Sequence, residues 1–297
     1  MPYLTDPTPC QGYPRTMPPS EPGKERRFLI GLARAFGGAI FFSLPLLMTM
    51  EMWELGFYMD RLRLGLFIAV FIPILMGLSH FAGFQETDSW LEDAVDGVIA
   101  YGVGFVTAGV VLSLLGILST TMPLREIIGM VALQAVPASV GAAMAKGQLG
   151  QSANEDESRD DEDSPENAGY WGTLFLMLAG AIFFAFNVAP TEEMILIAFR
   201  MTTWQSLALV GASLLMMHAF VYAVEFRGQV GRPEATSVGA AFLHFTAVGY
   251  AISLLVSLYV LWSFGRLESS GLLYSVQAMV VLGFPASLGA AAARLIL

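Results

Sequence analysis

Three glutamates lie near prolines at the ends of apolar segments, where carboxylates could bind a cation or exchange a proton. Glu51 comes shortly after Pro45, and Glu192 and Glu193 come shortly after Pro190. A proline within a helix removes a backbone hydrogen bond and frees a carbonyl. Such a break is tolerated in a membrane mainly where protein or a water-filled cavity covers it. A carboxylate at membrane depth costs roughly 2.5–3.5 kcal/mol and usually faces a pathway or a partner, so this combination predicts the wall of a polar cavity.

Alternative interpretations of these glutamates stay open. Glu51 could instead mark the end of a helix and be solvated, as we expect for Glu54. For Glu193 a functional role is favoured, because the apolar residues 194–199 continue beyond it and would place it within a helix. Asn187, in the middle of the same apolar segment, is a candidate neighbouring ligand, and the sequence leaves the identity of any metal unspecified.

All three histidines fall within apolar segments, at His80, His218 and His244. Histidine titrates near neutral pH, so a chain of such groups could relay protons. A lone histidine in a membrane more often makes a hydrogen bond between helices, and this second interpretation is the favoured one. Asp93 and Asp96 are expected to be solvated at the membrane boundary.

The composition requires lipid around these residues. The 297 residues are 55% hydrophobic and 13% charged, whereas about a quarter of the residues in a soluble domain are charged. A membrane span needs roughly 20 apolar residues, and segments of that length occur at 28–50, 62–82, 94–118, 126–146, 171–191, 203–224, 236–264 and 272–294. The sequence therefore predicts an all-α polytopic bundle of about eight spans. The fourth is the weakest, which leaves a seven-span alternative in which that helix is shallow or re-entrant.

The two halves of the chain resemble each other. The sequence GAIFF at 38–42 recurs at 180–184, TMEM at 49–52 resembles TEEM at 191–194, and PASVGAA at 137–143 resembles PASLGAA at 285–291. The spacing is 142 residues for the first two pairs and 148 for the third. We predict a tandem duplication of a four-helix unit, in which Glu51 corresponds to Glu193. Four spans return the chain to its starting side, so the two repeats should be parallel.

The predicted organisation has four parts, namely a disordered Pro-rich tail at 1–27, a first repeat at 28–147, an acidic linker at 148–170 and a second repeat at 171–297. The net charge of −10 arises mostly from the linker, because residues 155–166 carry eight acidic residues and one basic residue. A basic stripe that would bind nucleic acid is absent from the sequence. Of the lysines and arginines, ten fall on the side of the termini and five on the other, which predicts that both termini are cytoplasmic.

Nucleotide-binding, zinc-protease and paired CxxC motifs are absent from the sequence. We therefore expect neither an enzyme nor a cofactor. Three pairs of small residues spaced by four would allow close helix packing, namely Gly104 with Ala108, Gly141 with Ala145 and Gly289 with Ala293.

The segments GAIFFSLPLLMTMEMW at 38–53 and GAIFFAFNVAPTEEM at 180–194 resemble an uncharacterised family of bacterial integral membrane proteins, a domain of unknown function found in rhizobia and cyanobacteria. The resemblance covers most of residues 28–297. It implies the bacterial inner membrane, about seven spans and a small membrane-associated partner protein encoded next door. It implies no activity and no catalytic residue.

The leading hypothesis is a transporter or channel for a cation or proton, with its path along the interface between the halves. The glutamates would form the extracytoplasmic side of the path, and the histidines would form a cytoplasmic relay. The alternative is a membrane subunit or sensor that transports nothing and assembles with a partner protein or with another copy of itself. Transport requires the paired glutamates to face a polar cavity between the halves, whereas glutamates that point into bulk water would favour the alternative.

Overall fold

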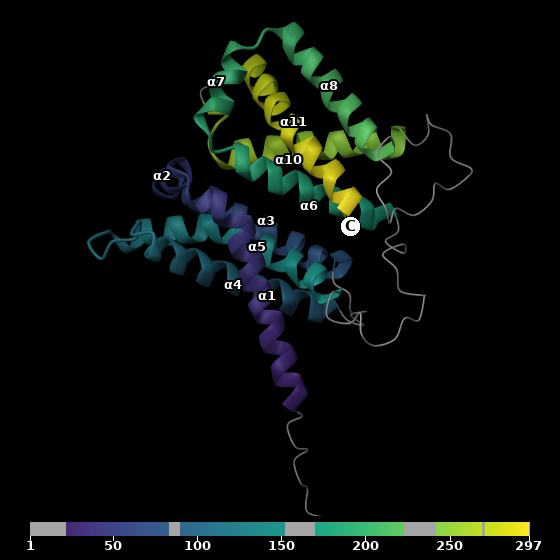
Figure 1. Cartoon of the computed structure of the whole chain (residues 1–297). Helices are drawn as coiled ribbons and strands as arrows, with labels where there is room; N and C mark the ends of the chain where they lie inside the picture. Colours follow the sequence, from purple (N-terminus) through teal and green to yellow (C-terminus); the bar gives the residue numbers. More distant parts are fainter. Residues whose placement is uncertain (1–21, 83–89, 152–169, 223–241, 269–270, 297) are drawn as a thin grey trace, which may run out of the picture.

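The structure is a computed structural model that describes residues 22–82, 90–151, 170–222, 242–268 and 271–296, and every regular element within these ranges is a helix. Figure 1 shows two packed groups of helices, one from each half of the chain. Within the described residues, seven helices are each long and apolar enough to cross a membrane, and an eighth candidate is a bent pair. The all-α polytopic class is therefore confirmed.

The helices of the first half are α1 (Pro22–Leu47), α2 (Met50–Tyr58), α3 (Arg61–Ala82), α4 (Trp90–Leu114) and α5 (Leu124–Gln151). Those of the second half are α6 (Tyr170–Val188), α7 (Glu192–Arg200), α8 (Thr203–Tyr222), the π-helical turn η2 (Phe242–Ala247), α10 (Val248–Ser263) and α11 (Leu272–Ile296). In each half a short helix, α2 or α7, follows the first long one. α1 begins within the predicted tail, and α5 extends to residue 151 within the predicted linker. The acidic residues 155–166 lie outside the described residues.

Helix α5, the predicted weak span, is the most buried of the spans. Its polar residue Gln134 lowers the hydropathy but is fully buried, and its Nε2 donates a hydrogen bond to the carbonyl of Leu46 at 3.2 Å. The irregular span is instead the sixth, where α7 and α8 meet at a bend of 120°. Helix α8 has 20 residues, about 30 Å at 1.5 Å per residue, so it is long enough to cross the bilayer.

The breaks after the first long helices have the same local chemistry. α1 ends two residues after Pro45, and α6 ends two residues before Pro190. The last carbonyls of a helix lack partners within the helix. The hydroxyl of Thr49 donates to the carbonyl of Leu46, and that of Thr191 donates to the carbonyl of Val188, both at 2.8 Å. A proline thus lies close to the end of each long helix, and a threonine beyond that end satisfies one of its last carbonyls.

Glycines bring the first and last long helices of each half into backbone contact. A Cβ atom added to Gly38 in α1 would lie 2.5 Å from the carbonyl oxygen of Gly141 in α5. One added to Gly180 in α6 would lie 2.2 Å from the carbonyl oxygen of Gly289 in α11. A Cβ on Gly104 in α4 would likewise lie 2.5 Å from a backbone oxygen of α5. The three predicted small-residue pairs therefore do lie at close helix crossings.

Aromatic side chains fill the interface between the halves. The ring centroid of Phe67 in α3 lies 5.6 Å from that of Phe186 in α6 and 5.8 Å from that of Phe264. Closer to the far end of α3, a Cβ on Gly77 would lie 2.4 Å from the ring of Phe175 in α6. The two halves therefore contact each other at two levels of α3, at Phe67 and at Gly77.

Candidate functional site

The glutamates lie at the helix breaks and not within the long helices. Glu51 is in the first turn of α2 and is half-buried. Glu192 and Glu193 are in the first turn of α7, and both are exposed. Glu193 does lie within a helix, but that helix is the separate α7 and not a continuation of α6, which ends before Pro190.

Arg266, in the connection between α10 and α11, lies among these carboxylates. Its Nη2 donates a hydrogen bond to the carbonyl of Pro190, between α6 and α7, at 2.5 Å. Burial lowers the pKa of Arg266, and the negative charges of Glu192, Glu51 and Glu54 oppose this change. We call these four residues, Glu51, Glu54, Glu192 and Arg266, the Arg266 cluster.

Carboxylates from both halves act electrostatically on this one arginine, and its hydrogen bond is to the Pro190 carbonyl. Glu51 and Glu54 come from the first half, and Glu192 comes from the second. Among the described residues, Glu193 is not one of the groups that act electrostatically on Arg266. The repeat pairs Glu51 with Glu193. The carboxylate of the second half that acts on Arg266 is instead that of the adjacent residue, Glu192.

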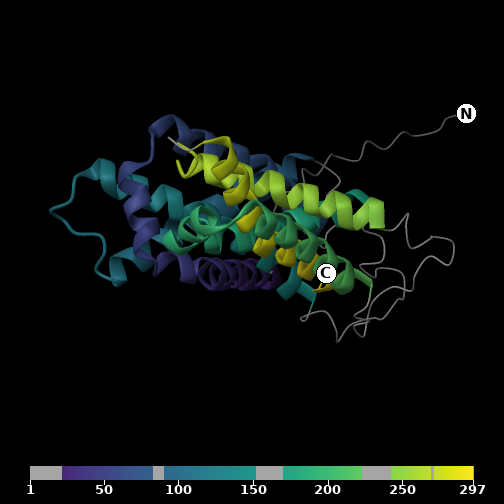
Figure 2. The same cartoon turned by 90° about the horizontal axis from the view of Figure 1, so that it is seen from above.

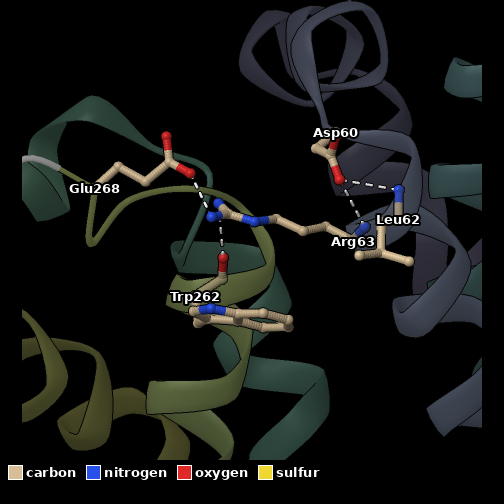
Figure 3. Close-up of polar contacts among 5 residues, drawn as sticks. All are labelled: Asp60, Leu62, Arg63, Trp262 and Glu268. Carbon is tan, nitrogen blue, oxygen red and sulfur yellow. Dashed lines mark hydrogen bonds and ion pairs between the residues drawn. The ribbon is translucent and has the colours of Figure 1, made fainter.

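A second arginine links the halves at the same end of the molecule (Figure 3). Arg63 in α3 forms an ion pair with Glu268, lies 5.4 Å above the centroid of the Trp262 ring and donates to the Trp262 carbonyl at 3.4 Å. Asp60 starts α3 by accepting the backbone N–H groups of Leu62 and Arg63 through Oδ1, at 2.9 and 3.2 Å.

Several backbone carbonyls near the helix breaks accept hydrogen bonds from side chains. Trp53 Nε1 donates to the carbonyl of Leu47 at 2.8 Å, and Gln277 Nε2 donates to the carbonyl of Met201 at 2.7 Å. Asn187, the predicted neighbouring ligand, donates its amide to the carbonyl of Phe183 in its own helix at 2.7 Å. These three carbonyls, which could otherwise act as ligands of a dehydrated cation, thus accept hydrogen bonds from protein side chains in this conformation.

Two of the histidines contact neighbouring helices. His80 Nδ1 lies 3.1 Å from Asp93 Oδ2 in α4, and His218 Nδ1 lies 3.2 Å from Thr246 Oγ1 in η2. Asp93 is only 6% exposed, so the expectation of a solvated aspartate was wrong. These contacts fit the favoured interpretation of hydrogen bonds between helices, and the proton relay stays a prediction. His244 accepts the Tyr170 hydroxyl at its backbone carbonyl, at 3.1 Å.

The described residues hold no group of three or more His, Cys, Asp or Glu side chains that could bind a metal. The groove formed by α4, α5 and their connection has a volume of about 580 Å³ and an apolar lining that includes Phe105, Val110 and Val131. None of the predicted site residues lines this groove, so it is not a polar cavity at the glutamates.

Sequence reasoning missed Arg266 and Arg63 as site residues. Arg266 was counted only as a loop charge, because a short connection between two spans is usually solvated. One sequence signal pointed to Arg266. The predicted topology places its loop on the same side of the membrane as Glu51 and Glu192.

The comparisons with known proteins identify a family but no activity. A family model described as "Putative integral membrane protein (DUF2391)" matches residues 31–297. No curated protein and no solved structure matches the chain.

Proposed function

The chain belongs to the DUF2391 family of integral membrane proteins, and we propose that it transports a small cation or a proton, with the Arg266 cluster at its extracytoplasmic entrance. The observation that carries this proposal is a partly buried arginine that binds the Pro190 carbonyl beside a helix break, within electrostatic range of carboxylates from both halves. Removing a charge from water is costly, so a partly buried arginine usually has a partner or a functional role.

Arg266 would act as a tethered counter-ion for the carboxylates. Its guanidinium is bound to the Pro190 carbonyl, and the negative charges of Glu192 and Glu51 act on it in that position. A cation or proton that arrives at the cluster would compete with Arg266 for the same carboxylates. Binding of the cation or proton would then weaken the hydrogen bond from Arg266 to the Pro190 carbonyl. The conformation of the α6–α7 break would therefore depend on whether the cluster has bound an ion.

We infer that the two halves arose by duplication of one unit and lie parallel in the bacterial inner membrane, with both termini in the cytoplasm. The matched glycine crossings and the matched threonine hydrogen bonds, each at the expected spacing of the repeat, support this inference. The eight-span count requires that α8 cross the bilayer. Its start lies beside Met201, whose carbonyl binds Gln277, and its far end carries His218 beside Thr246.

In this conformation Phe67 packs against Phe186 and Phe264 in the interface between the halves. The proposal therefore places only the entrance at that interface. The packed interface also favours the second candidate function, a subunit or sensor that assembles with a partner protein or with another copy. Glu192 and Glu193 are exposed, which is the arrangement that this second function predicts.

Ion flux in proteoliposomes separates the two functions. The native protein would be compared with Glu51→Gln and Glu192→Gln, and Glu193→Gln would serve as the control because it neutralises an adjacent, exposed carboxylate. We expect proton or cation flux that the first two substitutions abolish and the control retains. No flux above that of empty liposomes, with the protein folded, would refute transport. In vivo crosslinking from the α7 surface would then identify a partner.

A further inference from the structure

We infer that the transported ion is a proton and that it crosses through the second half of the chain, along buried polar side chains of α8, η2, α10 and α11; this rests on the proposed function. We call these side chains the polar track, and they are Tyr274, Gln277, Ser257, Ser253, Tyr250, Ser213 and Thr246. The track runs between the Arg266 cluster at one end and His218 at the other.

At one end, the track begins beside Arg266. Tyr274 in α11 is 8% exposed and lies within electrostatic range of Arg266. Gln277 is about one helical turn further along, and its Nε2 is bonded to the carbonyl of Met201 at the α7–α8 bend. The cluster therefore continues into the span through a phenol and an amide.

The middle of the track lies on one face of α10. Tyr250, Ser253 and Ser257 recur at spacings of three and four residues, which places them on one side of a helix, and all three are buried. Ser257 lies six residues before the end of α10, and Gln277 lies five residues after the start of α11. At 1.5 Å per residue, the two side chains are at a similar depth in the antiparallel pair.

The Tyr250 hydroxyl links α10 to α8 in the middle of the track. Tyr250 is 6% exposed, and its hydroxyl interacts with the side chain of Ser213 in α8, which is fully buried. Buried hydroxyls usually have a partner, and this contact joins Ser213 to the serine face of α10.

At the other end, Thr246 receives the track. Its side chain is fully buried, and its Oγ1 lies 3.2 Å from His218 Nδ1. Histidine exchanges protons near neutral pH, so a proton could pass between the track and the aqueous side here. A proton enters at one end while another leaves at the other, and each hydroxyl or water returns to its original state after reorientation.

The chemistry of the track suits a proton better than a metal cation. Hydroxyls and single waters can pass a proton without an open pore, whereas a metal ion needs several oxygen ligands at once. Among the described residues, no group of metal-binding side chains exists, and Gln277 already uses its amide on a backbone carbonyl.

The corresponding helix of the first half lacks the two serines, although it buries Tyr101 and Thr107. Gly116 and Gly265, both with φ +71°, end α4 and α10 in the same way and align the two helices at an offset of 149 residues. At that offset Tyr101 corresponds to Tyr250, and Gly104 and Ala108 correspond to Ser253 and Ser257. The Tyr101 hydroxyl is bonded to the Ile68 carbonyl at 2.7 Å. This tyrosine therefore supplies a matched control.

A structural explanation of the serines must be separated from the proposal. Their hydroxyls donate to carbonyls of their own helix, Ser253 to Gly249 at 2.9 Å and Ser257 to Ser253 at 2.7 Å. They could therefore serve only as small packing residues. Ser257→Ala keeps the small volume and removes the hydroxyl, and Tyr250→Phe keeps the ring. Packing alone would survive both changes.

The test measures proton flux in proteoliposomes that contain a trapped pH dye and an imposed K⁺ diffusion potential, with Na⁺ and K⁺ fluxes measured in parallel. We expect proton flux in the native protein and a decrease of at least about tenfold in Tyr250→Phe and in Ser257→Ala, because each removes a proton-transfer group. Tyr101→Phe should retain the native rate, and circular dichroism should show that all variants are folded.

Two results would overturn the inference and leave the proposed function intact. One is proton flux that Tyr250→Phe and Ser257→Ala leave unchanged, and the other is Na⁺ or K⁺ flux without proton flux. The absence of flux for every ion would overturn the inference and the proposed function together.

Discussion

At the scale of single residues, Arg266 has the largest structural role that the sequence did not predict. Its hydrogen bond to Pro190 ties the α10–α11 connection to the α6–α7 break, and its charge lies among carboxylates from both halves. Glu51 and Glu192 could be predicted as site residues, because carboxylates beside prolines in an apolar chain are rare. Arg266 could not, because its burial depends on how two connections meet in space.

We predict that Arg266→Gln destabilises the folded protein by about 1–2 kcal/mol, because a hydrogen bond from a charged donor to a partly buried carbonyl contributes on that order. Thermal unfolding in detergent measures the change. Arg200→Gln is the control, because Arg200 is exposed at the end of α7. An equal shift in the two variants would contradict the role assigned to Arg266.

At the scale of the elements, hydropathy predicted where the long helices lie but not the short ones. A helix of nine residues such as α2 or α7 is too short to stand out from the apolar segment beside it. Helix α5 was predicted to be a weak span because of its low hydropathy. Gln134 lowers its hydropathy, but its amide is paired with the α1 backbone, and that partner cannot be seen in the sequence.

The glycine crossings give a prediction at this scale. Gly180→Val should destabilise the protein by at least about 1–3 kcal/mol, the usual cost of overpacking, because its Cβ would collide with the backbone of α11. Gly141→Val should behave in the same way in the first half. Gly211→Val in α8 is the control, because a Cβ there meets no atom within 4 Å. Detergent thermal-shift assays would compare the three, and an equally unstable Gly211→Val would count against the crossing as the cause.

At the scale of the whole molecule, the sequence predicted two similar halves, and the path between them stays a prediction. The recurrence of short motifs is visible in the sequence, whereas the packing of Phe67 against Phe186 and Phe264 depends on the relative placement of the halves. In the view of Figure 2, the connection between α4 and α5 lies at the opposite end of the bundle from the C-terminus.

This arrangement predicts which residues share a side of the membrane. In a Cys10→Ser background, single cysteines at Asp60, Ser119 and Glu268 should react with an impermeant maleimide from the same side, and a cysteine at Tyr170 should react from the other. The reason is that Arg63, next to Asp60 at the start of α3, is paired with Glu268, and α4 and α6 each cross once from or to that end. Labelling of intact spheroplasts and inverted vesicles tests this. A re-entrant α7–α8 pair would instead put Glu268 on the side opposite Asp60.

The glycine crossings also have a mechanical consequence. At the crossings of α1 with α5 and of α6 with α11 there is no room for a Cβ atom. Neither pair of helices can slide without a collision between backbones, so we expect each half to move as a rigid body. The contacts between the halves that involve Phe67 and Arg63 are instead made by side chains, namely the Phe67 ring contacts and the Arg63–Glu268 ion pair. We therefore expect relative motion of the two halves to occur at this interface, and the Arg63–Glu268 ion pair would have to break before the halves separate there.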